Sequence, residues 1–494
     1  MGTSSTTALS ALGLTALGGR EARVTGLAVD SRQVRAGTLF FALPGSRVHG
    51  ATFIEAALQA GAGAILTDAE GANLARDALD AHDAALVIAE DPREALAHSA
   101  ALWFGAHPET VVAVTGTNGK TSVSTFCRQI WTELDLDAVN LGTTGVEGAW
   151  THPLRHTTPE PITLHRVLAQ ARAEGITHVA MEASSHGLDQ RRLDGIVLAA
   201  AGFTNFSQDH LDYHHTLEAY YDAKMGLFTR LLPDEGVAVV NLDDPKGMEV
   251  AQIAERKGHE VIGTGSHEAA RLRLLGQRYD GTGQELRYSW QGRTFLSRLG
   301  LIGGFQASNV LVAAGLAIAG GCDPDDVFGA LPQLSTVRGR MQLAASRDNG
   351  AAIFVDYAHT PDAVQTVLRA MKPHVLGRLI AIVGAGGDRD ATKRPLMGEA
   401  AAREADLVIV TDDNPRTEDP AVIRQAVMLG CPDATEVPDR AEAILRGVDA
   451  LQPGDALMIL GKGHETGQIV GQDILPFDDA EQASIAVAAL DGRL

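Results

Sequence analysis

The fold of this chain is decided by the stretch Val111-Val112-Ala113-Val114-Thr115-Gly116-Thr117-Asn118-Gly119-Lys120-Thr121-Ser122. An apolar run of strand character passes directly into a glycine turn that ends in Lys-Thr. Such a turn lets backbone N–H groups close on phosphate oxygens, while Lys120 adds a positive charge and Thr121 offers a hydroxyl to Mg²⁺. A full Walker-type loop has a further glycine where this chain has Val114, so only the TGTNGKT core is present. We expect a nucleotide-binding unit here, the alternative being an ordinary strand-to-helix turn.

Length and residue order both indicate several α/β domains. The chain has 494 residues, more than one hydrophobic core supports, so roughly two to four domains are expected. Ala- and Leu-rich stretches of helical character alternate with Val- and Ile-rich runs. This alternation predicts mainly parallel sheets covered by helices, which is an α/β fold.

The charge balance is acidic, with 41 Lys and Arg against 62 Asp and Glu and a net charge of -21. This argues against binding to nucleic acid or to an anionic membrane surface. Three cysteines, Cys127, Cys322 and Cys431, lack metal-site spacing, so we expect buried thiols, a reducing compartment and no zinc site. No apolar run approaches the ~20 residues that span a bilayer, and no basic and apolar leader opens the chain, so a cytoplasmic protein is predicted.

Three domains are predicted from the places where the strand and helix patterns change, at residues 1–95, 96–335 and 336–494. A helical connector at 92–104 ends before a proline, which discourages helix continuation. In the first domain we expect strands at 26–29, 38–43 and 64–67 and a helix at 53–61. In the second we expect strands at 179–182, 198–201 and 236–241 and a helix at 307–319. In the third, strands at 351–355, 379–383, 407–410 and 456–460 fit a smaller Rossmann-like domain.

Polar residues gather where the predicted strands end, which is where ligands bind in parallel α/β sheets. Glu182 ends a strand of the second domain, and together with Thr121 it makes a plausible first Mg²⁺ site of oxygen ligands. His210, in the polar segment 205–214, would complete a second site. The alternative for His210 is a hydrogen-bonded structural histidine.

Four polar loops follow the four strands predicted in the third domain, at 356–362, 384–390, 413–416 and 461–465. Because parallel strands end at one edge of their sheet, these loops are expected to converge on one crevice. The alternative is a set of ordinary turns rich in Gly, Pro, Asn and Asp. Turns do not require Arg, His and Glu in successive loops, so a binding site is favoured.

Together these motifs resemble the Mur ligase family of ATP-dependent amide ligases, and the match extends over essentially the whole chain. The residues that carry it are DSRQV, GTLFFAL, TGTNGKTS, HTTPEP, MEASSHGLDQRRL, FTNFSQDHLDYH, YYDAK, VRGRMQ, DYAHTPD, GGDRD, TDDNPRTEDP and GKGHE. The resemblance implies a first domain for a UDP-sugar, a central ATPase domain and a C-terminal domain that brings in an amino acid. These three domains agree with the boundaries drawn above.

The resemblance implies ATP and Mg²⁺ as cofactors. The family's carbamylated lysine falls on Lys224, where CO₂ would convert the amine into an anionic oxygen ligand for Mg²⁺. The metal ligands implied are Thr121, Glu182, His210 and Lys224, and the catalytic residues are Lys120, Glu182, His210 and Lys224. The ATP contacts implied are Gly116, Thr117, Asn118, Gly119, Lys120, Thr121 and Ser122, with Arg340, Asp356 and His359 from the third domain. Contacts from two domains require domain closure.

The implied reaction joins meso-diaminopimelate to a UDP-N-acetylmuramoyl-dipeptide. A carboxylate attacks the γ-phosphate of ATP, and an amine then displaces phosphate from the acyl phosphate. Arg416 is a planar, bidentate partner for the distal carboxylate that distinguishes diaminopimelate from lysine. Contacts to the nucleotide-sugar peptide are implied at Val29, Ser31, Ser46, Arg47, Val48, Thr157, Thr158, Ser184, Gln190 and Arg192. Contacts to the amino acid are implied at Arg389, Asp413, Asn414, Pro415, Arg416, Gly461 and Glu465.

Two alternative functions stay open at this point. One is another ligase of the same fold, either lysine-adding or a folylpolyglutamate synthetase, which the DNPR segment and the three-domain length disfavour. The other is a non-catalytic nucleotide-binding scaffold, which the intact catalytic residues disfavour. We expect a monomer. The chain departs from the residues common in the family at His49, His156, Gln306, Gln342 and Ala385.

Overall fold

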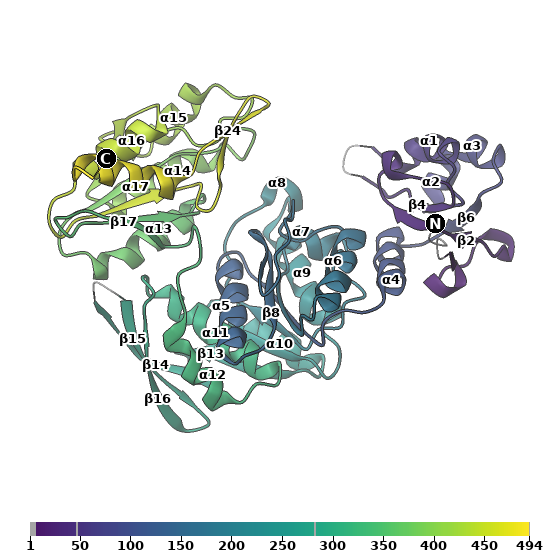
Figure 1. The fold of residues 1–494 in the computed structure, drawn as a ribbon, viewed down its shortest axis with the longest axis horizontal. Coiled ribbons are helices and arrows are strands. Elements are labelled where there is room, and N and C mark those ends of the chain that lie inside the picture. Colours follow the sequence, from purple (N-terminus) through teal and green to yellow (C-terminus); the bar gives the residue numbers. More distant parts are fainter. Residues whose placement is uncertain (1–5, 46–47, 281–282, 494) are drawn as a thin grey trace. The chain divides into compact units, whose positions relative to one another are not determined.

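The structure is a computed structural model that describes residues 6–45, 48–280 and 283–493 (Figure 1). Its contacts divide the chain into two compact units. Unit 1 comprises Met1–Thr115, Leu136–Ala201 and Asp222–Gly236. Unit 2 comprises Gly116–Asp135, Gly202–Tyr221 and Val237–Leu494. Within the described residues, no helix is both long and apolar enough to cross a membrane.

The N-terminal part of unit 1 is a four-stranded parallel sheet with helices on its faces. Its strands lie in the order β3 (Gly26–Ala28), β4 (Thr38–Phe41), β5 (Ala64–Thr67) and β6 (Ala85–Ile88). Successive residues of β4 point to opposite faces, so Phe41 joins one buried cluster and Phe40 the other. The strands expected in this domain are confirmed, whereas the helix predicted at 53–61 is the shorter α1 (Ile54–Gln59), preceded by the 3₁₀ turn η4 (Gly50–Phe53).

Helix α4 (Pro92–Phe104) begins and ends where the sequence indicates. Asp91 accepts hydrogen bonds from the backbone N–H groups of Arg93 and Glu94, and Pro92 occupies the first turn, where its missing N–H costs nothing. Strands β1 (Thr7–Ala8) and β2 (Arg23–Val24) form a small antiparallel pair. Four further strands of unit 1 lie in the order β7 (Thr110–Thr115), β10 (His178–Glu182), β8 (Ala138–Gly142) and β9 (Gly145–Gly148). Strand β10 is parallel to β7 and β8, so Glu182 stands at the carboxyl end of this sheet, beside the end of β7. The other helices here are α2 (Ala69–Leu74), α3 (Arg76–Asp80), α6 (Pro161–Ala173) and α7 (Ser185–Asp189).

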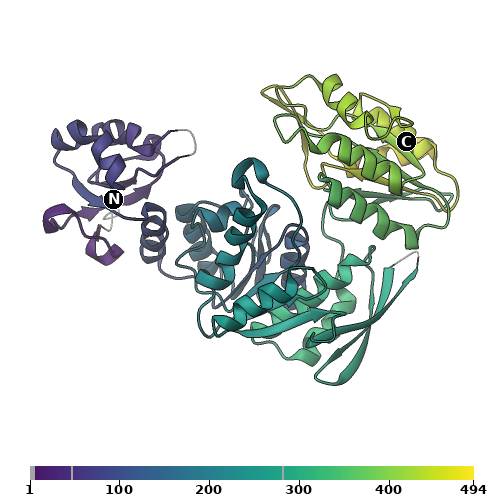
Figure 2. The ribbon, with the colours of Figure 1, turned by 180° about the vertical axis from the view of Figure 1, so that it is seen from behind.

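Unit 2 contains a run of strands that the sequence did not indicate. After the parallel pair β12 (Val237–Asn241) and β13 (Glu260–Gly265) come β14 (Leu272–Asp280), β15 (Gly283–Trp290) and β16 (Arg293–Leu299), which form an antiparallel meander. Figure 2 shows the three strands side by side, drawn in teal. The helices of this part are α5 (Lys120–Glu133), α10 (Gly247–Arg256), α11 (Phe305–Ala319) and α12 (Pro324–Ala330). The strand predicted at 198–201 lies two residues later, as β11 (Ala200–Phe203).

The C-terminal part of unit 2 is a six-stranded sheet in the order β17 (Gln342–Ser346), β18 (Ala352–Asp356), β22 (Ala456–Leu460), β19 (Leu379–Val383), β20 (Leu407–Val410) and β21 (Thr435–Glu436). All pairs are parallel except β17 with β18. The four predicted strands are confirmed, with edge strands β17 and β21 added. The hairpin of β23 (Gly467–Val470) and β24 (Asp473–Pro476) forms a separate small sheet.

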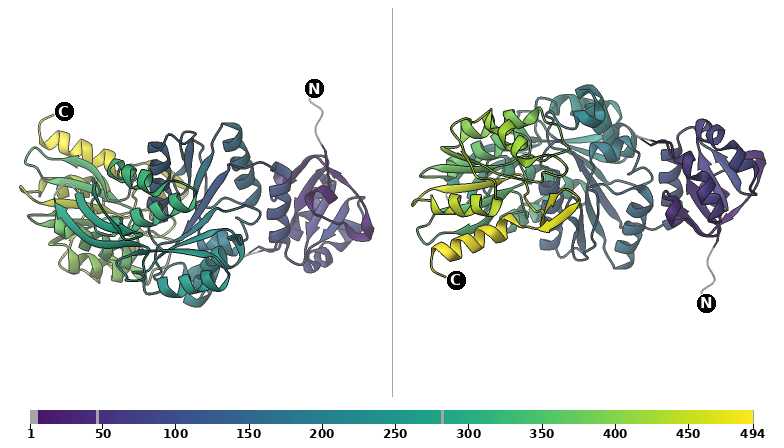
Figure 3. Two further views of the ribbon diagram at one scale, coloured as in Figure 1. Left: turned by 90° about the horizontal axis from the view of Figure 1, so that it is seen from below. Right: turned by 90° about the horizontal axis from the view of Figure 1, so that it is seen from above.

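Helices cover both faces of this C-terminal sheet, as the green-to-yellow part of Figure 3 shows. In strand β19, Ala381 and Val383 pack in one buried cluster with α13 (Pro361–Met371), α14 (Lys393–Glu404) and α15 (Pro420–Met428). Ile380 and Ile382 pack in the other cluster with α16 (Arg440–Asp449) and α17 (Asp479–Leu490). Because all central strands are parallel, β18, β19, β20 and β22 end at the same edge, where their polar loops begin.

Candidate functional site

The glycine turn after β7 leaves no room for side chains at two positions. Gly116 has φ 147° and Gly119 has φ 86°. A Cβ atom on Gly116 would lie 1.9 Å from the Thr204 hydroxyl, and one on Gly119 would lie 2.5 Å from the Asn309 side-chain oxygen. Helix α5 then begins at Lys120, and no side chain caps its N-terminus among the described residues. A tight glycine loop that leads into an uncapped helix N-terminus fits an anionic phosphate group.

A second segment, immediately after β11, holds this phosphate loop in shape. The Asn205 carbonyl accepts the Thr117 N–H at 2.9 Å, and the Asn205 side chain accepts the Asn118 N–H at 2.8 Å. The Thr204 hydroxyl donates to the Asn118 carbonyl at 2.6 Å, and the Thr117 hydroxyl donates to Ser207 O at 3.1 Å. These four hydrogen bonds tie the loop to the segment that follows β11.

The Lys120 side chain folds back over the loop. Its Nζ donates to the carbonyls of Gly116 and Thr117, both at 2.8 Å. The ammonium group therefore lies over the turn itself, where a phosphate would meet it.

Arg340 connects the C-terminal residues of unit 2 to the phosphate loop. Its Nη2 lies 3.4 Å from the hydroxyl of Thr121, and its guanidinium stacks 4.6 Å from the ring centroid of Tyr357. The structure thus brings two predicted nucleotide contacts, 219 residues apart in the chain, within reach of each other. The ring contact holds the guanidinium plane in place.

Asp356 ends β18 as a buried carboxylate held by backbone groups. It accepts the N–H of Met341 at 2.7 Å and the N–H of Ala358 at 2.8 Å. Burial raises the pKa of Asp356, although nearby Arg340 and the two N–H groups work in the opposite direction. His359 is the third nucleotide contact predicted in this domain. It is half-buried, and its Nδ1 lies 2.8 Å from the carbonyl of Tyr357. Burial lowers the pKa of His359.

His210 is the most exposed of the predicted catalytic residues, with 43% of its side chain accessible. It caps the short helix α8 (Leu211–His214) in the left-handed region, with φ 54°. Its Nε2 lies 3.5 Å from a carboxylate oxygen of Asp209. Burial by itself raises the pKa of Asp209, but the imidazoles of His210 and His359 hold it below its usual value. His210 is therefore a solvent-accessible imidazole beside an ionised carboxylate.

Glu182 is a buried carboxylate without a cation. It is 1% exposed, and Thr143 donates to it twice, from its N–H at 2.8 Å and from its hydroxyl at 3.2 Å. A Cβ on Gly142 would lie 2.1 Å from the Glu182 carboxylate. No ion pair reaches Glu182 from residues 6–45, 48–280 or 283–493. A buried anion with only neutral donors is costly, so the position fits a metal ion that would balance its charge.

The described residues contain no cluster of three or more His, Cys, Asp or Glu side chains able to hold a metal. An ion near Glu182 would therefore complete its shell with other oxygens, such as phosphate or water. Thr121 belongs to unit 2 and Glu182 to unit 1, so their joint metal site stays a prediction. Lys224 lies in α9 (Leu217–Gly226) and is 1% exposed.

The residues predicted to hold the muramoyl-peptide lie together around β10. The Thr158 hydroxyl donates to the Glu182 carbonyl at 2.9 Å and accepts the Ser184 hydroxyl at 3.0 Å. Arg192 donates to the Thr158 carbonyl at 2.6 Å and to Gln190 at 2.7 Å. Thr157 joins the group through a 3.0 Å contact with the Thr143 hydroxyl. Unit 1 thus assembles all five of these predicted residues beside Glu182.

The residues predicted for the uridine end are less well tied together. Ser31 opens the 3₁₀ turn η3 (Ser31–Gln33), which the Asp30 side chain caps. Val29 is partly buried against the core, and Val48 is 57% exposed. Ser46 and Arg47 lie outside the described residues.

The loops after β20 and β22 meet through Asn414. Its Nδ2 donates to Glu465 Oε2 at 2.8 Å, and its Oδ1 accepts the Ile469 N–H at 2.9 Å. Asp413 accepts the Asn414 N–H at 2.6 Å, and a Cβ on Gly461 would lie 2.4 Å from the Asp413 carboxylate. The structure therefore brings four of the predicted amino-acid contacts together.

Arg416 offers unused donors in the same place. It has φ 52°, and its Nη1 donates to the carbonyl of Gly387 at 2.8 Å. Its side chain is half-buried, and within the described part of the chain Nε and Nη2 have no hydrogen-bond partner. Pro415 is buried beside it, whereas Arg389 is exposed, with Nη1 3.1 Å from the Asp388 carbonyl. One edge of the Arg416 guanidinium is thus fixed and the other is available to a carboxylate.

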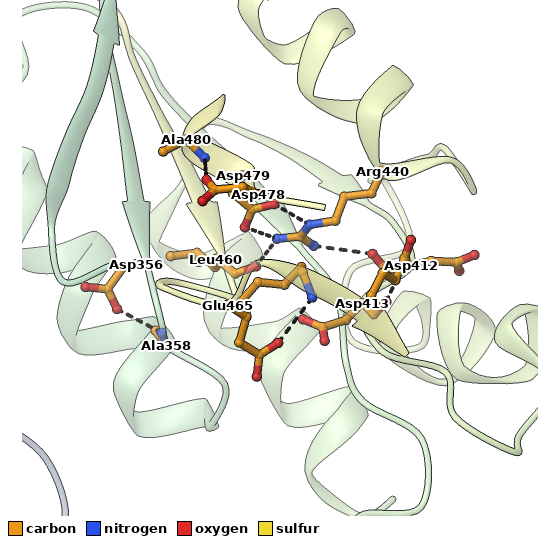
Figure 4. A network of polar contacts seen from close by, with 12 residues as sticks. Asp356, Ala358, Asp412, Asp413, Arg440, Leu460, Glu465, Asp478, Asp479 and Ala480 are labelled. Carbon is orange, nitrogen blue, oxygen red and sulfur yellow. Dashed lines mark hydrogen bonds and ion pairs between the residues drawn. The ribbon is translucent and has the colours of Figure 1, made fainter. Parts of the chain in front are cut away.

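A buried ion pair lies behind these loops (Figure 4). Arg440 and Asp479 are both 0% exposed and form two hydrogen bonds of 2.7 Å. Arg440 also donates to the carbonyls of Leu460, at 2.9 Å, and Asp412, at 3.3 Å. These carbonyls stand where β22 and β20 pass into the loops with Lys462 and Asn414, so the pair anchors both loops.

Sequence reasoning missed three groups that the structure places here. They are Thr143, the Arg440–Asp479 pair and Lys462. Thr143 follows strand β8, so the rule that ligands collect at strand ends could have found it. Arg440 and Asp479 are 39 residues apart, so nothing local marks them as a pair. Lys462 lies in the polar loop 461–465 that the sequence indicates, but its contact with Asn414, 48 residues away, has no local signal.

Two of the departures from the family's common residues also find partners. Gln306 is buried and accepts the Asn309 side-chain amide at 3.0 Å, next to the phosphate loop. Gln342 accepts the N–H of Gly339 at 2.7 Å, one residue before Arg340. Both glutamines are therefore integrated into the structure around the loop.

Three family descriptions match consecutive parts of the chain. "Mur ligase family, catalytic domain" matches residues 23–103, "Mur ligase middle domain" matches 114–317, and "Mur ligase, glutamate ligase domain" matches 339–463. The chain belongs to the Mur ligase family, whose members are ATP-dependent ligases.

Its relatives point to one branch of that family. A UDP-N-acetylmuramoyl-L-alanyl-D-glutamate--2,6-diaminopimelate ligase from Bradyrhizobium diazoefficiens is 48% identical, over 94% of this chain and 95% of its own length. The enzyme of the same name from Caulobacter vibrioides is 47% identical, over 95% and 96%. A solved structure of a ligase of this name is 34% identical, with a TM-score of 0.68 and 95% of both chains covered.

Proposed function

We propose that this chain is an ATP-dependent ligase that joins meso-2,6-diaminopimelate to UDP-N-acetylmuramoyl-L-alanyl-D-glutamate in the synthesis of a peptidoglycan precursor. The observation that carries the proposal is Arg416, a half-buried guanidinium with two unused donors beside the paired side chains of Asn414 and Glu465. A diamino dicarboxylic acid presents the carboxylate and ammonium groups that such a pocket complements.

The reaction forms an amide in two balanced steps. The D-glutamyl γ-carboxylate attacks the γ-phosphorus of ATP, the bond to the β,γ-bridging oxygen breaks, and an acyl phosphate and ADP result. The neutral amine of diaminopimelate then attacks the acyl carbon, and phosphate leaves with the C–O bonding pair while the amine releases a proton. Positioning and charge neutralisation supply most of the catalysis in such transfers.

The chain's own residues fit the first step. Lys120 lies over the phosphate loop and would offset the repulsion between carboxylate and triphosphate. Arg340, which is already in contact with Thr121, would add a second positive charge. His359 and Asp356 would complete the nucleotide contacts.

Mg²⁺ would be held by the Thr121 hydroxyl and the Glu182 carboxylate, with His210 and a carbamate on Lys224 at a second site, and would supply charge neutralisation at the phosphates. Two chemical observations support these metal sites. Glu182 is a buried anion without a cation, and Lys224 is a buried amine whose charge CO₂ would reverse. The peptide substrate would lie against the cluster of Thr157, Thr158, Ser184, Gln190 and Arg192, and its uridine against Val29, Ser31 and the 46–48 loop.

The amino acid would bind through the loops of the C-terminal sheet. Arg416 would take the distal carboxylate, while Asn414 and Glu465 would face an ammonium group. Lysine lacks the distal carboxylate and would leave the Arg416 guanidinium desolvated and unpaired, which costs a few kcal/mol, on the order of a hundredfold or more in discrimination. The domain boundaries at 95 and 335, the monomeric state and the cytoplasmic location belong to the same proposal.

The test is phosphate release by the purified protein with ATP, Mg²⁺ and UDP-N-acetylmuramoyl-L-alanyl-D-glutamate, with meso-diaminopimelate or L-lysine added in parallel and product mass confirmed. Turnover that requires diaminopimelate supports the proposal. Turnover with lysine alone would keep the chemistry and overturn the role of Arg416. Normal ATP binding without turnover on any amine would indicate a non-catalytic scaffold.

A further inference from the structure

Lys462 is a fully buried lysine that the reaction described above does not use. It lies in the loop after β22 and is 0% exposed. Its Nζ has three acceptors, Asn414 Oδ1 at 3.1 Å, Glu465 Oε2 at 3.1 Å and the carbonyl of Gly467. An ammonium group carries three donors, so every N–H of Lys462 is used.

These contacts determine the orientation of the Asn414 amide. Its Oδ1 faces two donors, the ammonium of Lys462 and the N–H of Ile469. A flipped amide would place its NH₂ group against both donors and its oxygen against the Glu465 carboxylate. The NH₂ group is therefore directed to Glu465 Oε2, at 2.8 Å.

Lys462 also balances the charge of Glu465. Oε2 of Glu465 is occupied by Lys462 and Asn414, whereas the side chain as a whole is 31% exposed. Oε1 has no hydrogen bond within the part of the chain that the structure describes. One oxygen is thus held inside the loop and the other is left for a ligand.

The charge of Lys462 is needed here because the neighbouring buried cation already has a partner. Asp413 and Glu465 lie near the buried Arg440, whose charge is already matched by Asp479 (Figure 4). Without Lys462, the Glu465 carboxylate would keep only the Asn414 amide as an inner partner, and Asn414 would lose one of the two donors that orient it. A partly satisfied buried network is less rigid and less specific than a complete one.

We propose that Lys462 is a positioning residue of the amino-acid site, which sets the Asn414 amide and fixes Glu465 with one carboxylate oxygen free for an ammonium group of the incoming diamino acid. This inference rests on the proposed ligase function. Lys462 itself does not touch the substrate; it acts through Asn414 and Glu465.

The test replaces Lys462 with a side chain of similar length that can neither donate nor carry charge, Lys462→Met. The Michaelis constants for meso-diaminopimelate, ATP and the UDP-dipeptide are measured separately in the phosphate-release assay. Loss of a charged hydrogen-bond donor predicts a rise of about tenfold to a hundredfold in KM for diaminopimelate. The other two KM values should change less than about twofold, because the phosphate loop does not contact Lys462.

A matched control removes another lysine ion pair of the same domain. Lys372 is half-exposed and pairs at 2.8 Å with the buried Glu404, which keeps Arg369 as a second partner, so Lys372→Met should leave all three KM values unchanged. In a Glu465→Gln background, Lys462→Met should raise KM for diaminopimelate much less, at most about threefold, because the carboxylate that Lys462 pairs with is then absent. If Lys462→Met does not fold, Lys462→Gln removes the charge but keeps a polar group and carries the same comparison.

The outcomes separate the two hypotheses. If the wild-type protein turns over diaminopimelate and Lys462→Met raises only that KM, the inference is supported. If all KM values and kcat change in parallel, or if the effect is the same in the Glu465→Gln background, Lys462 is merely structural and the inference is overturned. If the wild type has no activity with diaminopimelate, the proposed function itself fails.

Discussion

Removal of Arg440 should destabilise the C-terminal sheet more than any surface substitution in that domain. Arg440 and Asp479 are fully buried and doubly hydrogen-bonded, so Arg440→Met leaves a carboxylate in the core without its cation. The carbonyls of Leu460 and Asp412 lose their donor as well.

The magnitude follows from the burial of the partner left behind. Breaking a buried ion pair by removal of one partner costs about 3–5 kcal/mol, because the remaining charge is uncompensated. Asp479 is the first residue of helix α17, and the positive end of the helix dipole returns about 0.3–1 kcal/mol. The expected loss is therefore roughly 3–4 kcal/mol. Since about 1.4 kcal/mol is tenfold in an equilibrium constant, this is roughly a 10²- to 10³-fold change.

Hydrogen exchange measures this loss directly in the full chain. The amides of β22 lie between β18 and β19 at the centre of the sheet and exchange only when the domain opens. Under conditions where closing is faster than exchange, Arg440→Met should speed their exchange by roughly 10²- to 10³-fold. The amides of β10, in unit 1, serve as an internal reference and should not change.

A control on the same helix isolates the effect of burial. Arg446 pairs with Glu442 on the surface of α16, where the two side chains are 57% and 48% exposed. Arg446→Met should accelerate β22 exchange by less than about threefold, since exposed pairs of this kind contribute only ~0.3–0.5 kcal/mol. If Arg440→Met and Arg446→Met gave similar exchange rates, the argument from burial would be refuted.

Three further predictions concern the loop, the acid response and the amino-acid pocket. Gly119→Ala forces a φ of 86° on alanine and places its Cβ 2.5 Å from Asn309 Oδ1. The affinity for ATP should therefore fall at least about tenfold in a fluorescent-nucleotide titration. Unchanged affinity would show that the loop accommodates the Cβ without loss of binding. Burial lowers the pKa of His165 from 6.5 to about 4, beside the Asp194 carbonyl, so its neutral form is favoured in the fold. The contribution of His165 to the free energy of unfolding should be complete above pH 6.5 and fall by up to roughly 3 kcal/mol toward pH 4. His165→Leu should flatten this part of the pH profile of thermal unfolding, and an unaltered slope would contradict the role of His165. Arg416→Ala should raise KM for diaminopimelate about a hundredfold and leave ATP binding intact, and an unchanged KM and kcat would remove Arg416 from the site.

The parts of the fold that sequence reasoning predicted best are the buried parallel strands. Strands such as β19 and β22 are covered by helices on both faces, so their residues are apolar at every position and stand out as continuous apolar runs rich in Ile and Leu. Strands β14, β15 and β16 were missed because they form an antiparallel meander with many exposed positions. Their sequences carry Arg, Gln and Ser among the apolar residues, and their pairing is decided by neighbours rather than by their own composition.

The sequence by itself determined the phosphate loop, the strand-end positions of the polar loops and the kinship with the Mur ligase family. These features are local, since a glycine that must adopt a positive φ and a lysine that folds back on its own turn act within a few residues. Only the tertiary structure decided that Lys462 is buried against Asn414, 48 residues away, and that Arg440 meets Asp479, 39 residues away. A lysine or arginine is normally solvated, and its burial depends on which distant segments supply the acceptors that balance its charge.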